Sequence, residues 1–269
     1  DAGRGYSVYK PQGVFSVTGP VNQGASYSVG GFGNSGWASN TEQTAGASPA
    51  VYGSGWHLVG NPYLAAYTLN SPAGFDDAAV WVTGGPWSGT YQSLNMATGR
   101  VAPFQGFMVH GTGTFTFDKN NLSTNTTTNF YRTPSDNSLS VTVSGNGFND
   151  ITYVEFNRDA TNQFDAGYDS RKLASRSIQP TLYTMTNGMY QSVNVNNSIA
   201  QTPNIPMGMR TGRSGTFTFS VEGINTFDPT SFIYLEDLVT GQWHDLRQSP
   251  TYTFSMNATD NPNRFVLHF

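Results

Sequence analysis

Hydrophobic and polar residues alternate over short stretches throughout the chain, which is the pattern of β-strands that bury one face. No window of eleven or more residues repeats its hydrophobic positions with the period of a helix. Many short strands at a roughly regular spacing predict β-sandwiches or jelly rolls, so we expect an all-β protein. The segments that carry this pattern are 6–17, 79–82, 107–109, 114–117, 138–143, 151–156, 215–221, 231–235 and 264–269.

Turn residues separate these predicted strands. The dipeptides Asn-Gly at 146–147 and Thr-Gly at 240–241 mark tight turns. A Gly-Thr-Gly sequence at 111–113 lies between the alternating stretches 107–109 and 114–117, and it therefore predicts a β-hairpin.

A chain of 269 residues is long enough for two domains of ordinary size. The stretch 120–129 is rich in Asn and Thr and has little to bury, so we place a boundary between Asp118 and Asp136. Residues 1–130, which are rich in Gly and Trp, are predicted to form one jelly-roll-like β-sandwich module. Residues 131–269 are predicted to form the second.

The composition restricts the possible functions. Aromatic residues make up 14% of the chain and charged residues only 11%, against about 25% in an ordinary soluble domain. The net charge is −4 and no basic run is present, which argues against nucleic-acid binding. No apolar stretch is long enough to predict a transmembrane segment. Cysteine is absent, which excludes disulfides, zinc–thiolate sites and cysteine nucleophiles.

Several segments are much more distinctive than the composition. They are GWHLVGNPY at 55–63, APFQGFMV at 102–109, ATNQFDAGYDSRKL at 160–173, YLED at 234–237 and RFVLHF at 264–269. In this order they resemble the β-rich region that precedes the C-terminal sorting domain in Bacteroidetes surface and secreted proteins, the substrates of the type IX secretion system. The opening AGRGY at 2–6 fits the start of that region.

This resemblance implies an extracellular or outer-cell-surface location. It also implies that a short sorting domain normally follows the RFVLHF segment. Because the resemblance runs across residues 120–129, the two modules could also pack together as one unit. The family region occurs in adhesins, gliding-associated proteins and multidomain enzymes, so the resemblance implies location and architecture more firmly than activity.

The residues that could carry catalysis form no recognised motif. There is no G-x-S-x-G nucleophile elbow and no H-E-x-x-H zinc motif. A glycosidase needs two carboxyl groups facing each other across a cleft, and the candidate pairs are 76–77, 165 with 169, and 236–237. Short sandwich modules seldom have a deep cleft, so we predict that the chain is not an enzyme. The four histidines are His57, His110, His244 and His268.

The segment from Asn157 to Asp169 is the most polar candidate site. Its oxygen-bearing side chains are of the kind that Ca²⁺ prefers, although their spacing is not that of an EF-hand. The alternative is that Asp165 and Asp169 cap turns by accepting backbone N–H bonds and pair with Arg171 or Lys172. A structural calcium is thus a candidate cofactor, and no other cofactor is predicted. The candidate ligands are Asn157, Asp159, Asp165 and Asp169.

Aromatic residues in and beside Gly-rich loops of the N-terminal half predict a glycan-binding surface. An exposed indole ring can stack on the face of a sugar while its polar neighbours bind the hydroxyl groups. Trp37, Trp87 and Tyr91 are the candidates, and Trp87 is the best because GGPWSG at 84–89 presents it on a turn. The alternative is that Trp87 packs over a loop. Trp56 and Trp81 lie in apolar strand patterns, so we predict both in the core.

These observations favour a non-catalytic extracellular surface module with a structural or adhesive role, as part of a surface fibre or a large adhesin. The alternative is a carbohydrate-binding accessory module of a secreted polysaccharide-degrading enzyme. The expected partners are polysaccharides, cell-surface proteins or further copies of the chain.

Overall fold

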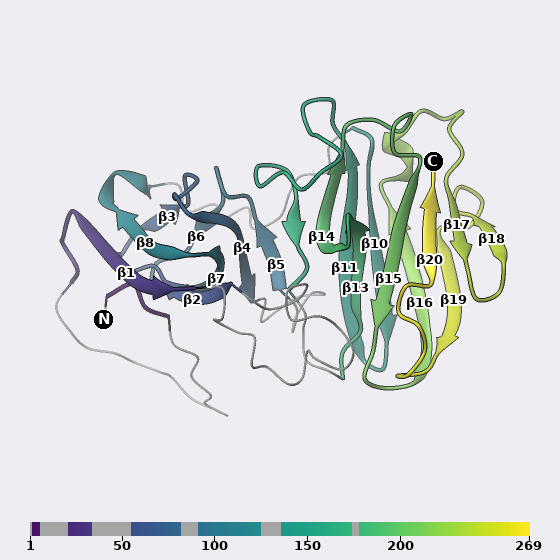
Figure 1. Ribbon diagram of the computed structural model, residues 1–269, viewed down its shortest axis with the longest axis horizontal. Helices are drawn as coiled ribbons and strands as arrows, with labels where there is room; N and C mark the ends of the chain where they lie inside the picture. The colour runs from purple at the N-terminus through teal and green to yellow at the C-terminus, as the bar shows by residue number, and fades with distance from the viewer. Residues whose placement is uncertain (1, 6–20, 34–54, 82–90, 125–135, 174–177) are drawn as a thin grey trace. The chain divides into compact units, whose positions relative to one another are not determined.

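The computed structural model describes residues 2–5, 21–33, 55–81, 91–124, 136–173 and 178–269, and this part of the chain consists mainly of β-strands (Figure 1). Its helical elements are the short 3₁₀ turns η2 (Lys119–Asn121) and η3 (Ile224–Thr226). The predicted all-β class is confirmed. In the same described part, no helix has the length and apolar character needed to cross a membrane.

The chain divides into two compact units. Unit 1 takes residues 1–39, 54–80 and 94–132, and unit 2 takes residues 40–53, 81–93 and 133–269.

Three small sheets surround the core of unit 1. That core is strongly aromatic, and the rings of Phe115 and Phe117, both fully buried, lie 4.8 Å apart. The first sheet pairs β1 (Ser26–Phe32) with β8 (Gly113–Asp118). The second has the order β2 (Trp56–Gly60), β7 (Gly106–Gly111), β4 (Phe75–Trp81) and β5 (Tyr91–Leu94), and the third has the order β6 (Arg100–Val101), β3 (Ala66–Thr68) and β9 (Leu122–Ser123).

The predicted hairpin at residues 111–113 is wrong. Strand β7 pairs with β2 and β4, whereas β8 pairs with β1, so this bend carries the chain from one sheet to another. Gly111 has φ 151°, and a Cβ atom there would lie 2.2 Å from the carbonyl oxygen of Gly74. Alternation followed by turn residues looks the same for a hairpin and for a corner between two sheets, so the sequence did not separate them.

The strands of residues 138–268 in unit 2 form one eleven-stranded sheet that curls around the main core of this unit (Figure 1). The order is β18-β17-β20-β15-β13-β14-β11-β10-β16-β19, with β12 beside β14, and all pairs are antiparallel except β11 with β14. The strands are β10 (Ser138–Gly145), β11 (Phe148–Phe156), β12 (Ser170–Arg171), β13 (Thr181–Thr186), β14 (Met189–Asn196), β15 (Asn204–Arg210), β16 (Gly215–Glu222), β17 (Tyr234–Asp237), β18 (Gln242–Asp245), β19 (Thr251–Met256) and β20 (Phe265–His268).

The turn predicted at residues 146–147 is confirmed. It joins β10 to β11 with Gly145 opposite Phe148. Asn146 has φ 53° and Gly147 has φ 81°. Positive φ at both central residues is what a two-residue turn of type I′ requires, and Asn-Gly adopts it at the least cost.

A buried ionic clasp joins the two ends of this sheet. Asp237 of β17 accepts hydrogen bonds from Nε and Nη2 of Arg264, at 2.7 and 2.6 Å. At the other end of the sheet, in β19, the hydroxyl of Tyr252 donates to Asp237 at 2.8 Å, and Nη1 of Arg264 donates to the carbonyl of Ser255 at 2.7 Å. We call these four residues the clasp.

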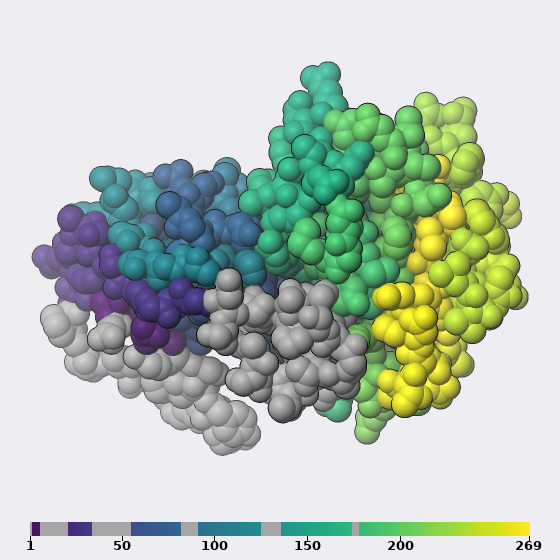
Figure 2. All heavy atoms as spheres, in the orientation of Figure 1, coloured from purple at the N-terminus to yellow at the C-terminus, as the bar shows by residue number. Residues whose placement is uncertain are grey.

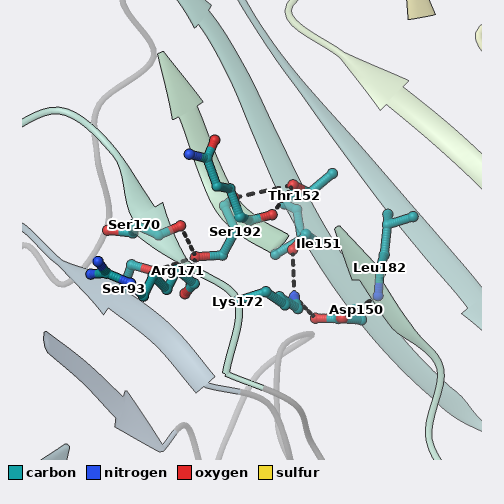
Figure 3. A network of polar contacts seen from close by, with 10 residues as sticks. Ser93, Asp150, Ile151, Thr152, Ser170, Arg171, Lys172, Leu182 and Ser192 are labelled. Atoms are coloured by element: carbon teal, nitrogen blue, oxygen red, sulfur yellow. Dashed lines mark hydrogen bonds and ion pairs between the residues drawn. The ribbon is translucent and has the colours of Figure 1, made fainter. Parts of the chain in front are cut away.

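A second ion pair is buried beside β11 (Figure 3). Nζ of Lys172 lies 2.7 Å from Oδ1 of Asp150, and the side chains are 3% and 1% exposed. Lys172 also donates to the carbonyl of Ile151, and the backbone N–H of Leu182 donates to Oδ2 of Asp150. Burial raises the pKa of Asp150, and the ammonium group of Lys172 offsets this only in part. Removing either residue would therefore leave the other buried without its ionic partner.

Candidate functional site

Aromatic side chains cover the outer face of β17, β18 and β20 in unit 2. Leu235 and Asp237 are buried, so the alternating residues Tyr234 and Glu236 lie on the opposite face of β17. Trp243 of β18 is directly opposite Glu236, and His268 of β20 is directly opposite Tyr234. These strands belong to the C-terminal segment coloured yellow-green to yellow in Figure 2, where it reaches the surface.

Four side chains form a continuous patch on this face, which we call the aromatic platform: Phe232, Tyr234, Trp243 and His268. The indole of Trp243 is 56% exposed and stacks on the imidazole of His268, with ring centroids 4.1 Å apart and planes at 26°. The ring centroids of Tyr234 and Trp243 are 6.2 Å apart, and so are those of Phe232 and Tyr234. Phe232 is 59% exposed. An exposed Trp resting on a fixed ring is a ready stacking surface for a ligand.

Polar groups hold this platform in place. Nε2 of His268 lies 2.9 Å from Oε2 of Glu236, and Nδ1 lies 2.8 Å from Oδ1 of Asn204. These two contacts fix the imidazole beneath the indole, so Trp243 rests on a rigid support. The same carboxylate and amide provide hydrogen-bonding groups at the edge of the stacking surface.

This platform is absent from the residues that the sequence predicts to bind a ligand. Its signal was present, because Trp243 follows the predicted turn at 240–241 by only two residues. A short strand after a tight turn often lies at a sheet edge, where its outward side chain is exposed. The prediction from the sequence instead places the binding residues in the Gly-rich loops of the N-terminal half.

A groove of about 740 Å³ opens where β10 begins and where β11 and β14 end. Phe156 and Ile199 supply apolar surface, while Glu155, Arg158 and Asn197 supply charged and amide groups. Because β10 and β11 are antiparallel and β14 runs parallel to β11, all three of these strand ends lie at one mouth of the curled sheet. The mouths of such sheets are frequent ligand sites.

The loop predicted to bind calcium uses its carboxylates to organise the backbone. Oδ2 of Asp165 accepts the N–H of Thr161 at 2.6 Å. Oδ2 of Asp169 accepts the N–H of Asp165, and its Oδ1 accepts the N–H of Val195, both at 2.7 Å. These bonds match the turn-capping alternative.

The other two predicted calcium ligands, Asn157 and Asp159, also form a local hydrogen bond with each other. Oδ1 of Asn157 accepts the N–H of Asp159 at 3.1 Å, and Asn157 also lines the groove. Lys172, which the alternative paired with Asp165 or Asp169, binds Asp150 instead. Within the described ranges no three His, Asp or Glu side chains are grouped closely enough to hold a metal ion.

Of the three predicted glycan-binding residues, the structure describes Tyr91. Trp37 and Trp87 lie outside the described residues. Tyr91 is half-buried, with its ring edge-on to Trp81 at 4.9 Å, and burial raises its pKa. Trp56 is buried as predicted, but Trp81 is 36% exposed at the end of β4, so the core prediction is wrong for Trp81.

Two histidines of unit 1 are held by neighbouring side chains. Nδ1 of His110 lies 2.6 Å from Oδ1 of Asp76, and its ring is edge-on to Trp56. His57 stacks on Phe32 with centroids 4.4 Å apart, and burial lowers the pKa of His57.

The adjacent carboxylates of β17 lie on opposite faces of the sheet. Glu236 faces outward and contacts His268, whereas Asp237 faces the core and binds Arg264. They are therefore not placed to flank one glycosidic bond.

Comparison with known families adds one match. The model of a family described as "Domain of unknown function (DUF8693)" matches residues 68–269, which is most of the chain. The chain belongs to the DUF8693 family. No curated protein and no solved structure matches it.

The DUF8693 match contains most of the candidate features. It spans the aromatic platform, the groove and the loop 157–169, together with Trp87 and Tyr91, whereas Trp37 precedes it. The platform and the groove are therefore parts of the domain itself.

Proposed function

We propose that this DUF8693 protein is a non-catalytic, extracellular surface module that adheres to polysaccharide through the aromatic platform of unit 2. The observation that carries the proposal is the exposed indole of Trp243, stacked at 4.1 Å on the fixed ring of His268. Secretion and an outer-surface location rest on the sequence resemblance to type IX export substrates.

The chemistry of the platform suits an uncharged sugar. The C–H face of a pyranose ring is apolar and flat, so it can stack on an indole, while its hydroxyl groups need both donors and acceptors. Glu236 and Asn204 lie at the edge of the platform and supply a carboxylate and an amide. A rigid platform also loses little conformational entropy when it binds.

The positions of the carboxylates favour binding over hydrolysis. Asp237 is committed to Arg264, and Asp165 and Asp169 accept backbone N–H bonds. Asp76 contacts His110. These acids already have structural partners, which supports a non-catalytic role.

The groove offers a second surface for the same class of ligand. Its apolar groups and its amide and charged groups could bind a sugar unit beyond those stacked on the platform.

The test is the affinity of the purified chain for a panel of polysaccharides and oligosaccharides, measured by calorimetry and pull-down. Trp243→Ala is expected to weaken binding by at least about tenfold, which corresponds to ~1.4 kcal/mol, without unfolding the chain because the indole is mostly exposed. Phe104→Ala is the matched control, because Phe104 is an exposed ring of unit 1 (62%). Arg158→Ala, in the same series, reports whether the groove takes part.

Unchanged binding by Trp243→Ala would refute the platform as the glycan site, and loss of binding by Trp87→Ala alone would move the site to the N-terminal half. Absence of any glycan binding, combined with self-association of the chain, would instead favour the fibre role.

A further inference from the structure

The interior of unit 2 contains polar side chains where its strand pattern calls for apolar ones. Leu182 of β13 belongs to the core, so Thr184, two residues further along, points to the same side of the sheet. Thr184 is fully buried and lies directly opposite Met207, another core residue. On its other side it lies opposite Gln191 of β14, which is also fully buried.

Asn194 of β14 is placed in the same way. It lies opposite Val154 of β11, a core residue, and is 1% exposed. Thr184, Gln191 and Asn194 therefore bring one hydroxyl and two amide groups among the apolar side chains of this core.

The hydrogen bonds among these groups are incomplete. The hydroxyl of Thr186 lies 3.4 Å from Oε1 of Gln191 and 3.2 Å from Oδ1 of Asn194, and Asn196 donates to Asn194 at 2.9 Å. Oγ1 of Thr184, Nε2 of Gln191 and Nδ2 of Asn194 are buried and have no protein partner. Thr186 links the two amides, so these groups belong to one contiguous cluster.

Buried polar groups without partners are rare, because each loses its hydrogen bonds to water on folding. Three such atoms in one cluster indicate that a small polar molecule binds there. We infer that a buried water site bridges Thr184, Gln191 and Asn194 inside the curled sheet. A water molecule accepts two hydrogen bonds and donates two, so it can accept from both amide groups and donate to the threonine hydroxyl. Leu182, Met207 and Val154 make the surroundings apolar, which disfavours an ion.

A high-resolution crystal structure of the full chain tests the site directly. We expect ordered solvent density within hydrogen-bonding distance of Nε2 of Gln191 and Nδ2 of Asn194. An empty interior, side-chain amides that bond each other directly, or an ion in place of water would overturn the inference.

The direction in which Thr184→Val changes the melting temperature provides an independent test. Thr184→Val keeps the side-chain shape and removes the hydroxyl. If Thr184 binds water, the variant loses a hydrogen bond and its melting temperature falls. If the hydroxyl has no partner, removing it relieves a buried polar group and the melting temperature rises.

Thr216→Val is the matched control, because Thr216 lies exposed on β16 and reports only the strand preference of valine. The inference requires Thr184→Val to have a lower melting temperature than Thr216→Val. An equal or higher value contradicts it. Should Thr184→Val fail to fold, the crystallographic test on the unmodified chain still decides.

Discussion

The clasp that joins the two ends of the unit 2 sheet makes a quantitative prediction for Arg264→Met. Asp237 and Arg264 are 1% and 5% exposed, and two charge-assisted hydrogen bonds of 2.6 and 2.7 Å connect them. Methionine fills much of the same volume but leaves the carboxylate of Asp237 buried without its counter-charge. Breaking a buried pair in this way costs about 3–5 kcal/mol.

The assay is urea denaturation of the full chain, with unfolding followed by far-UV circular dichroism. Arg213→Met is the control, because Arg213 is exposed, and its effect is expected to stay within about 0.5 kcal/mol. A loss of less than about 1 kcal/mol for Arg264→Met would refute the idea that the clasp holds the sheet closed.

The same pair predicts a dependence on pH. Burial raises the pKa of Asp237, but the hydrogen bonds from Arg264, Tyr252 and Val239 outweigh burial and hold that pKa below its ordinary value. The carboxylate therefore stabilises the folded state at any pH above the unfolded pKa of Asp, about 3.9. This stability is lost as the pH falls below that value and through the folded pKa. The double variant Asp237→Asn, Arg264→Met should lose this part of the acid dependence, and an unchanged acid profile would contradict the assignment.

Two further predictions concern the other polar groups of unit 2. Lys172→Met should destabilise the chain by about 3–5 kcal/mol in urea, because it leaves Asp150 buried without its partner; adding Asp150→Asn should recover part of this loss, and no recovery would show that the two residues act independently. A calcium chelator should leave the melting temperature unchanged, because Asp165 and Asp169 already accept backbone N–H bonds, whereas a clear fall on adding chelator would establish the structural calcium.

The strands of unit 2 that bury one face were predictable from the sequence, whereas β13 and β14, which contain runs of consecutive buried residues, were not. Strands β10, β11, β16 and β20 coincide closely with the alternating segments, and Asn-Gly at 146–147 can hardly form anything except a tight turn. The pairing order was not predictable. Alternation identifies a buried face without naming the strand beside it, so nothing in the sequence places β20 between β15 and β17.

The site was harder to predict for a related reason. Whether a Trp in a strand is buried depends on which face of the sheet meets the core, and that depends on the register. Trp56 and Trp81 lie in similar apolar stretches, yet Trp56 is buried and Trp81 is 36% exposed. Trp243 lies on the surface because it is opposite Glu236, whose neighbours Leu235 and Asp237 face inward. The sequence does not show this pairing.

The clasp and the aromatic platform lie on opposite faces of one strand, and this links stability to binding. Glu236 holds His268 beneath Trp243 on the outer face, and its neighbour Asp237 holds Arg264 on the inner face. The backbone ladder aligns β17 with β20, and the buried ion pair adds a side-chain link between Asp237 at the end of β17 and Arg264 just before β20. If the platform binds glycan as proposed, Arg264→Met should weaken binding as well as folding, although Arg264 lies on the opposite face of the sheet.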